Sequence, residues 1–163
     1  MMTNDHTAAT LQLIRDEQDI RDLGYRFADA CNRGDVEEFR SLWARDAVWV
    51  IDDPMNVRAE GAAAIAGTLA QLRPMWDFFV QMPHAPVVRV DGDRATSTWT
   101  VSEHARHAAD GRDYVNHARY DDELARTPEG WRYAHRRYGY YFLDDGPRAG
   151  AAAAPVRPGP GIH

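Results

Sequence analysis

Residues 20–50, IRDLGYRFADACNRGDVEEFRSLWARDAVWV, organise the rest of the chain. Their first half carries apolar side chains at steps of three and four residues, which places those side chains on one side of a helix. The pattern predicts a helix whose buried face is made by Ile20, Leu23, Phe27 and Cys31. This face is the expected floor of a core.

The helix has a predicted end and a predicted successor. Gly34 is expected to terminate it with a positive φ. Asp35 then begins a second helix as its N-cap, with Glu38 at the spacing of a reciprocal capping box. Asn32 therefore lies in the last turn of a core-packing helix, where a polar group can line a pocket.

Outward from this segment the pattern is first helical. Residues 1–9 are polar and expected to be loose, and a short helical segment is expected at residues 11–14, before an Asp-rich turn at residues 15–19. A strand is predicted at residues 47–51 and an alanine-rich helix at residues 60–72, which stops before Pro74. Residues 75–79 hold an aromatic cluster, for which a lid over a cavity and ordinary core both remain open.

From residue 80 the period changes to two, and turn sequences separate the strands. Strands are predicted at residues 87–90, 95–101, 114–124 and 131–142. Three N-terminal helices followed by an antiparallel meander give an α+β fold, with helices on one face of a curled sheet. Residues 1–143 are predicted to be one domain. Residues 144–163 are a Gly/Ala/Pro-rich tail, either flexible or folded back over the open end of the sheet.

Composition excludes several classes of function. The chain has 163 residues and a net charge of −6, without the basic stripe that nucleic acid requires. It shows neither a signal peptide nor an apolar run long enough to span a bilayer, so no membrane partner and a cytoplasmic location are expected. Cys31 is the single cysteine. It is interpreted as a small buried hydrophobe in preference to a nucleophile.

Two residues stand out as candidates for proton transfer. His84 lies between Pro83 and Pro86, which restrict where the imidazole can point, although a histidine satisfied by a carbonyl group is the plain alternative. Glu103 continues the apolar face of Trp99 and Val101, and burying a carboxylate is costly unless it is paired or protonated. Glu103 is therefore the more unusual of the two.

The following strand separates a polar face from a face that could line a cavity. His117, Arg119 and Asp121 share the face expected to meet solvent or another subunit. Asn116 and Tyr120 lie on the other face. Metal-ligand spacings are lacking apart from a weak pair of histidines at residues 104 and 107, and no nucleotide-binding or elbow-serine motif is present. The sequence therefore gives no support to a metal site, to nucleotide binding or to elbow-serine hydrolysis.

The order of these motifs resembles the SnoaL-like branch of the nuclear transport factor 2-like superfamily. The resemblance rests on residues 32–35, 42–49, 84, 92–95 and 120–132. It implies a cone-shaped α+β barrel with a mostly apolar pocket at its wide end. Scytalone dehydratase, bile acid 7α-dehydratase and hexachlorocyclohexane dehydrochlorinase belong to this branch and act without a cofactor, through a histidine base supported by an aspartate from the first long helix.

Carried over residue by residue, the resemblance assigns site positions. His84 matches the histidine, but Asn32 stands where those enzymes have the aspartate, and a neutral amide cannot stabilise an imidazolium well. Glu103 matches a second acidic position. The resemblance also places pocket-lining positions at or near Phe27, Trp49, Trp76, Tyr120 and Arg136.

These observations predict a cofactor-independent acid/base enzyme of the dehydratase, isomerase or cyclase type, acting on a small hydrophobic oxygenated substrate in secondary metabolism or catabolism. His84 and Glu103 would be the acid/base pair, and Asn32 would orient His84 or bind a substrate oxygen. The substrate is expected to contact Phe27, Trp49, Trp76, Trp99, Asn116, Tyr120 and Arg136.

Two other functions remain open at this point. One is a non-catalytic module that binds a hydrophobic ligand, with Asn32 marking a lost dyad. The other is an epoxide-opening hydrolase or cyclase that uses Asp52, Glu103 and Tyr120. In either case the outer strand faces are expected to support a homodimer or homotrimer.

Overall fold

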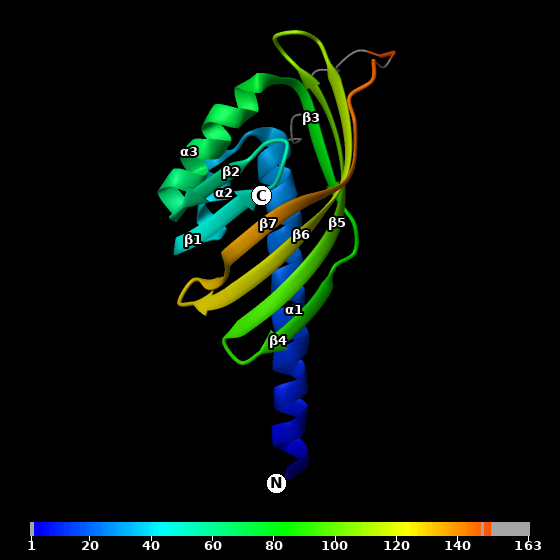
Figure 1. Cartoon of the computed structure of the whole chain (residues 1–163). Helices are drawn as coiled ribbons and strands as arrows, with labels where there is room; N and C mark the ends of the chain where they lie inside the picture. The colour runs from blue at the N-terminus through cyan, green and yellow to red at the C-terminus, as the bar shows by residue number, and fades with distance from the viewer. Residues whose placement is uncertain (1, 148, 151–163) are drawn as a thin grey trace, which may run out of the picture.

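The computed structural model describes residues 2–147, 149 and 150, and it shows an α+β fold in which a curled sheet wraps around a long helix (Figure 1). The helices are α1 (Met2–Arg33), α2 (Val36–Ser41), α3 (Ala62–Leu72) and the 3-10 turn η1 (Arg73–Met75). The strands are β1 (Trp43–Ile51), β2 (Val57–Glu60), β3 (Trp76–Pro83), β4 (Val87–Asp91), β5 (Arg94–His107), β6 (Asp113–Thr127) and β7 (Gly130–Asp144).

The sheet confirms the predicted meander and extends it. Its strand order is β2-β1-β7-β6-β5-β3, with β4 also paired to β5. Strand β1 runs parallel to β7, and the remaining pairs are antiparallel. Strands β3 and β4 pair with different halves of β5, so together they form one interrupted edge. The aromatic residues 75–79, for which no regular element was predicted, belong mainly to β3, and the short β2 was also missed.

Helix α1 corrects two expectations about the start of the chain. It is continuous, so residues 3–9 are helical and residues 15–19 form no turn. It packs against β3, β4 and β7, and its N-terminal end extends beyond the sheet (Figure 1). None of the helices in the described residues is both long and apolar enough to cross a membrane.

The acidic run at residues 15–19 stays helical because Asp16 faces inward and is fully paired. Its carboxylate accepts hydrogen bonds from Arg126 Nη1 and Nη2, both at 2.8 Å, and from Trp131 Nε1 at 3.1 Å. Only 3% of Asp16 is exposed. These contacts join the middle of α1 to the end of β6 and the beginning of β7.

This pairing predicts acid sensitivity. Hydrogen bonds from Arg126 lower the pKa of Asp16 from 3.8 to about 2. Since the folded-state pKa lies below the unfolded value, the stabilisation is present above pH 3.8 and disappears as the pH falls through about 2. Asp16→Asn should therefore cost about 2 kcal/mol near neutrality. The difference in unfolding free energy from wild type, measured by urea denaturation, should shrink with acid; a constant difference would contradict this account.

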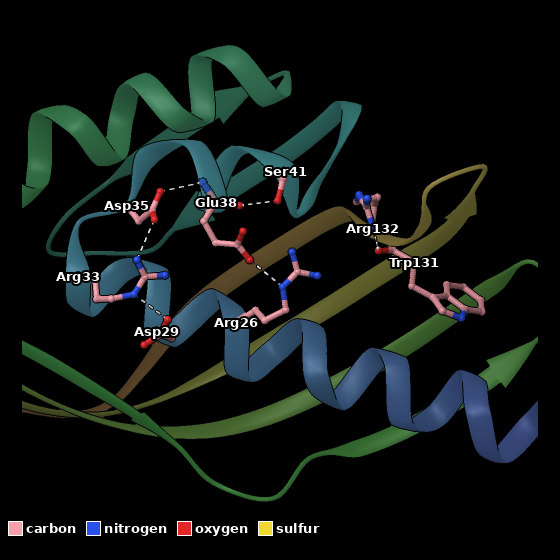
Figure 2. Close-up of polar contacts among 8 residues, drawn as sticks. All are labelled: Arg26, Asp29, Arg33, Asp35, Glu38, Ser41, Trp131 and Arg132. Atoms are coloured by element: carbon pink, nitrogen blue, oxygen red, sulfur yellow. Dashed lines mark hydrogen bonds and ion pairs between the residues drawn. The ribbon is translucent and has the colours of Figure 1, made fainter. Parts of the chain in front are cut away.

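The junction of α1 and α2 forms much as predicted (Figure 2). Gly34 has φ +69°, and the Asp35 N–H reaches back to the Ala30 carbonyl at 2.9 Å, so α1 ends in a Schellman-type turn. The Asp35 side chain accepts from the Glu38 N–H at 2.9 Å and caps α2. The reciprocal half of the capping box is absent, because Glu38 binds Arg26 instead.

The core is aromatic and lies between α1, α2 and the sheet. Phe27 from α1 packs against Phe39, Trp43, Trp49 and Tyr133, with ring centroids 5.0–6.5 Å apart. Strand β1 begins at Trp43, four residues before the predicted start, and so contributes two of these rings. The predicted stripe on α1 is confirmed, since Ile20, Leu23, Phe27 and Cys31 are all buried.

Candidate active site

A cavity of about 330 Å³ lies between α3, η1 and the inner faces of β1, β3, β5, β6 and β7. Its walls are mostly apolar or aromatic. Five of the predicted site residues line it, namely Trp49, Trp76, Glu103, Asn116 and Tyr120. A concave apolar site with a few convergent polar groups is the usual form of a small-molecule site.

The polar centre of the cavity is the Glu103 carboxyl group. One oxygen, Oε1, accepts from Gln81 Nε2 at 2.5 Å. The other, Oε2, accepts from the Tyr138 hydroxyl group and from Asn116 Nδ2 at 3.3 Å. Gln81 Nε2 also donates to the Tyr120 hydroxyl oxygen at 3.0 Å. Four strands, β3, β5, β6 and β7, therefore each send a side chain to this one point.

Burial decides the protonation behaviour of this group. Glu103 is only 7% exposed, and burial raises the pKa of its carboxyl group. The hydrogen bonds from Tyr138, Gln81 and Asn116 oppose this effect only in part. Burial also raises the pKa of Tyr138 and of Tyr120, so both phenols stay protonated and remain donors.

Two amide oxygens at the centre have unused hydrogen-bonding capacity. Within the part of the chain that the structure describes, Gln81 Oε1 and Asn116 Oδ1 are buried and accept no hydrogen bond. A buried acceptor without a donor costs free energy, and a ligand hydroxyl group would remove that cost. The centre is therefore suited to a hydroxyl-bearing molecule.

Two bulges in β7 determine which of its side chains face inward. In the register with β6, Leu124 pairs with Tyr133 and Glu123 with His135, so one residue of β7 is extra. The alternation consequently shifts by one, and Arg136 and Tyr138 turn inward. A second shift, between the partners of His117 and Ala118, lies nearer the end of β7.

Behind the cavity lies a buried ion pair. Arg136 Nε donates to Asp122 Oδ1 at 2.7 Å, and Arg136 Nη2 donates to Oδ2 at 3.1 Å. The guanidinium carbon lies 3.9 Å from the Tyr120 ring centroid and 4.1 Å from those of Phe27 and Tyr133. Burial lowers the pKa of Arg136, but the charge and hydrogen bonds of Asp122, together with Tyr133 and Tyr120, outweigh it and leave the pKa above its ordinary value. Burial raises the pKa of Asp122, and the charge of Arg136 opposes this effect. The guanidinium group therefore stays charged against the Tyr120 ring.

Three of the predicted substrate contacts belong to this supporting layer. Phe27, Trp99 and Arg136 are each about 1% exposed and do not line the cavity. Trp99 lies over Gly24 of α1, where an added Cβ would come within 2.1 Å of the indole ring. Its Nε1 donates to Ser97 Oγ, which in turn donates to Asp122. These residues pack behind the cavity wall and do not line the cavity.

The predicted pairing of His84 with Glu103 is corrected by the structure. His84 is exposed, does not line the cavity, and has its Nε2 3.0 Å from Ser102 Oγ on the outer face of β5. The same Ser102 Oγ is also 3.2 Å from His117 Nδ1. The cause is the chain direction at the end of β3, where Gln81 points inward and His84 follows after the strand has ended at Pro83.

Asn32 also has a different role from the one predicted. Its Nδ2 donates to the Gln81 carbonyl oxygen at 3.0 Å, and its Oδ1 accepts from the Gln81 N–H at 2.7 Å. The side-chain amide thus pairs with the β3 backbone as another strand would. Within the part of the chain that the structure describes, Asn32 makes no hydrogen bond to His84 and does not line the cavity, but it fixes Gln81, which binds Glu103.

Replacing Asn32 by aspartate tests this interpretation. A carboxylate in Asn32→Asp cannot donate to the Gln81 carbonyl oxygen and would place a negative oxygen beside it. The change should cost about 1–3 kcal/mol of unfolding free energy at neutral pH, measured by urea denaturation. The deficit should decrease in acid, where a protonated carboxyl group can donate again. An unchanged or higher stability would show that the two hydrogen bonds are unimportant.

The structure adds site residues that the sequence did not reveal. Gln81 was missed because β3 was not predicted, and Tyr138 was missed because a bulge sets its facing. His107 lines the cavity, whereas the sequence singled it out only as a weak metal-ligand pair with His104. The alternation that identified Glu103 on β5 continues through Ala105 to His107 and was the available signal for it.

Other predicted chemistry lacks the necessary convergence. Asp52 pairs with Arg137 at 3.0 Å in a separate polar groove, so it does not join Glu103 and Tyr120 as an epoxide-opening site would require. Cys31 lines the cavity, but burial raises the pKa of its thiol, as expected for a packed hydrophobe. Among the described residues, no three His, Cys, Asp or Glu side chains are grouped to hold a metal ion.

Comparisons with known proteins agree with this architecture. Residues 12–137 match the family model of the SnoaL-like domain. No functionally curated protein matches the chain in sequence.

Solved structures give the same fold. A hexachlorocyclohexane dehydrochlorinase, LinA type 2, superposes with a TM-score of 0.78 at 21% identity, covering 94% of this chain and 99% of that one. A protein from Novosphingobium aromaticivorans provisionally named a scytalone dehydratase has a TM-score of 0.73 at 17% identity and covers 92% and 97% of the two chains. A nuclear transport factor 2-like protein from the same organism has a TM-score of 0.70 at 27% identity, with 83% and 88% covered.

Proposed function

Because the chain belongs to the SnoaL-like domain family, we propose that it is an acid/base enzyme that needs no cofactor and acts on a small, hydrophobic, oxygen-bearing molecule. The fold is one whose distant structural relatives include a dehydrochlorinase and a provisional dehydratase. Fold alone does not define an activity, so the proposal rests on the site.

The observation that carries the proposal is the buried Glu103 carboxyl group in an aromatic cavity. A carboxyl group with a raised pKa keeps its proton at pH values where exposed glutamates have lost theirs. It can therefore donate that proton to a substrate oxygen that becomes more basic during the reaction. Glu103 takes the role of general acid, in place of the predicted pair with His84.

The surrounding groups fit the ionised state of this acid. When Glu103 has lost its proton, Tyr138, Gln81 and Asn116 are already placed to donate to the carboxylate. Donors that are fixed before the reaction stabilise developing charge without reorganisation. The free acceptors on Gln81 and Asn116 would orient a substrate hydroxyl group beside the acid.

The step is balanced in either of two reactions. With a carbonyl substrate, the Glu103 proton moves to the carbonyl oxygen while a water molecule takes a proton from the neighbouring carbon, giving an enol. With a hydroxyl substrate, the same proton moves to the departing hydroxyl oxygen, a water molecule takes a proton from the adjacent carbon, and the electron pair left there forms the double bond as water is released. Enolisation followed by protonation at another carbon is isomerisation, whereas loss of water is dehydration.

Hydrogen exchange of a simple ketone tests the proposal. We expect the protein to accelerate deuterium uptake at the α-carbons of 2-tetralone in D₂O, followed by NMR, because this ketone is apolar and small enough for the cavity. The acceleration should be lost in Glu103→Gln and kept in Glu123→Gln, which changes an exposed glutamate on β6. Equal exchange with and without the protein would refute the proposal.

A non-catalytic binding module is the second candidate. It is favoured by one observation, the engagement of Asn32 with the β3 backbone instead of with a histidine. In that case 2-tetralone would bind, as seen by quenching of tryptophan fluorescence, but would exchange at the rate found in buffer.

A further inference from the structure

A histidine of the cavity wall lies beside an aspartate at the end of β5. His107, the last residue of β5, lines the cavity, and its Nδ1 lies 3.0 Å from Asp110 Oδ1 in the turn to β6. We propose that His107, oriented by Asp110, is the general base that complements Glu103, and that the substrate is an elongated conjugated molecule reaching both residues. This inference rests on the proposed function, in which Glu103 is the acid.

The position of the His107 ring is fixed from several sides. Its backbone N–H donates to the Arg112 carbonyl at 2.8 Å, and its own carbonyl accepts from the Gly111 N–H at 2.9 Å. Its ring meets Trp76 edge to face, with centroids 5.7 Å apart. Asp110 is held as well, because the Arg112 N–H donates to its Oδ1 at 3.1 Å. The pair is therefore built into a closed turn.

The hydrogen bond to Asp110 determines what the ring can do. A carboxylate beside Nδ1 selects the tautomer that carries its proton on Nδ1, which leaves the lone pair on Nε2. None of the hydrogen bonds found among the described residues engages Nε2. Asp110 is thus a positioning residue, and Nε2 of His107 is the atom available to accept a proton.

The spacing of the two groups limits the substrate. Glu103 and His107 lie on the same face of β5 and are four residues apart, which separates their Cα atoms by about 13 Å. With their Cα atoms this far apart, the two side chains are suited to act on different parts of a substrate and not on adjacent atoms of one small group. They suit a molecule in which a conjugated or aromatic system connects the two ends.

The proton and electron balance follows from this arrangement. His107 Nε2 takes a proton from a carbon or hydroxyl group at the end of the substrate that lies beside it, and the released electron pair moves through the conjugated system. At the other end the Glu103 proton passes to the oxygen that becomes more basic or departs. An isomerisation returns both protons within the cycle, whereas an elimination leaves a protonated His107 and an ionised Glu103 that exchange protons with water.

A probe reaction that needs a base but no acid tests the role of His107 separately from the role of Glu103. In 5-nitrobenzisoxazole, removal of the C3 proton breaks the N–O bond and gives the coloured 2-cyano-4-nitrophenolate. With enzyme in excess over probe, we expect turnover faster than with free imidazole at the same concentration. The rate should fall about 100-fold in His107→Gln. His104→Gln, which changes an exposed histidine on the same strand, should keep the wild-type rate.

The outcomes are distinct. Turnover that depends on Glu103 but not on His107 would overturn the inference and would assign the base to Glu103. Turnover no faster than that of free imidazole would also overturn the inference. Nitrogen NMR of the wild-type imidazoles gives a second readout that does not depend on the folding of a variant. The inference requires the Nδ1–H tautomer for His107, with a change of tautomer in Asp110→Asn, and an Nε2–H tautomer in the wild type would also overturn it.

Discussion

Replacing Glu103 by glutamine is expected to reduce turnover by about 100-fold or more, the usual contribution of a general acid, while leaving ligand binding largely intact. Glutamine keeps the size and the acceptor oxygen of the side chain, so Tyr138 can still donate to it. It cannot release a proton to a substrate oxygen. Two quantities are measured for each variant: the rate of deuterium exchange at the α-carbons of 2-tetralone, and the affinity with which the protein binds this ketone.

The same substitution is expected to stabilise the protein above neutral pH. Burial raises the pKa of Glu103 in the folded state above the value of the unfolded chain. The stability linked to this group is therefore complete below the unfolded pKa and is lost as the pH rises and ionisation is forced on a buried carboxyl group. Glu103→Gln removes this loss.

The melting temperature of Glu103→Gln should thus match that of wild type near pH 4 and exceed it near pH 8. Glu123→Gln is the matched control, because its carboxylate is exposed, and it should change neither turnover nor melting temperature noticeably. A melting temperature of Glu103→Gln below that of wild type at high pH would mean that the carboxylate stabilises the fold. Glu103 would then not be an acid whose pKa is raised by burial.

The second large effect is expected at the buried ion pair. Asp122→Ala should destabilise the protein by about 3–5 kcal/mol, because it leaves the Arg136 guanidinium buried without a counter-charge. Arg136 is 1% exposed, and its Nη1 already has no partner among the described residues. Urea denaturation measures the change in unfolding free energy.

The neighbouring Asp121 supplies a matched control. It forms an ion pair with Arg119 at 2.6 Å, but its side chain is 54% exposed. Asp121→Ala should therefore cost less than about 1 kcal/mol. The double variant Asp122→Leu with Arg136→Met removes both charges and should recover much of the lost stability. Equal costs for Asp121→Ala and Asp122→Ala would contradict the account of a charged, buried pair.

Much of the fold could be predicted because its helices and hairpins are coded locally. The apolar stripe on α1, the Asp35 cap and the turns between β4, β5, β6 and β7 each depend on residues close together in the chain. Strands β2 and β3 were missed because they are short or lie at the edge of the sheet. Their side chains lack clean alternation, and only pairing with a distant strand makes them regular.

The site could be predicted only where alternation is unbroken. Glu103 was found because β5 alternates strictly between buried and exposed positions along most of its length. His84 was misplaced because the end of β3 at Pro83 was not known, and Arg136 was assigned to the cavity although it lies behind it. Tyr138 depends on a bulge in β7, which involves two strands and leaves no mark in the local pattern.

The hydrogen bonds between Asn32 and Gln81 also constrain how this protein can evolve. Both bonds go to backbone atoms of Gln81, so they depend on the side chain at position 32 and not on the one at position 81. An exchange at position 81 would alter the contact with Glu103 but leave the join between helix and sheet in place, whereas an exchange of the amide at position 32 would break the join itself. Position 32 is therefore expected to tolerate fewer residue types than position 81.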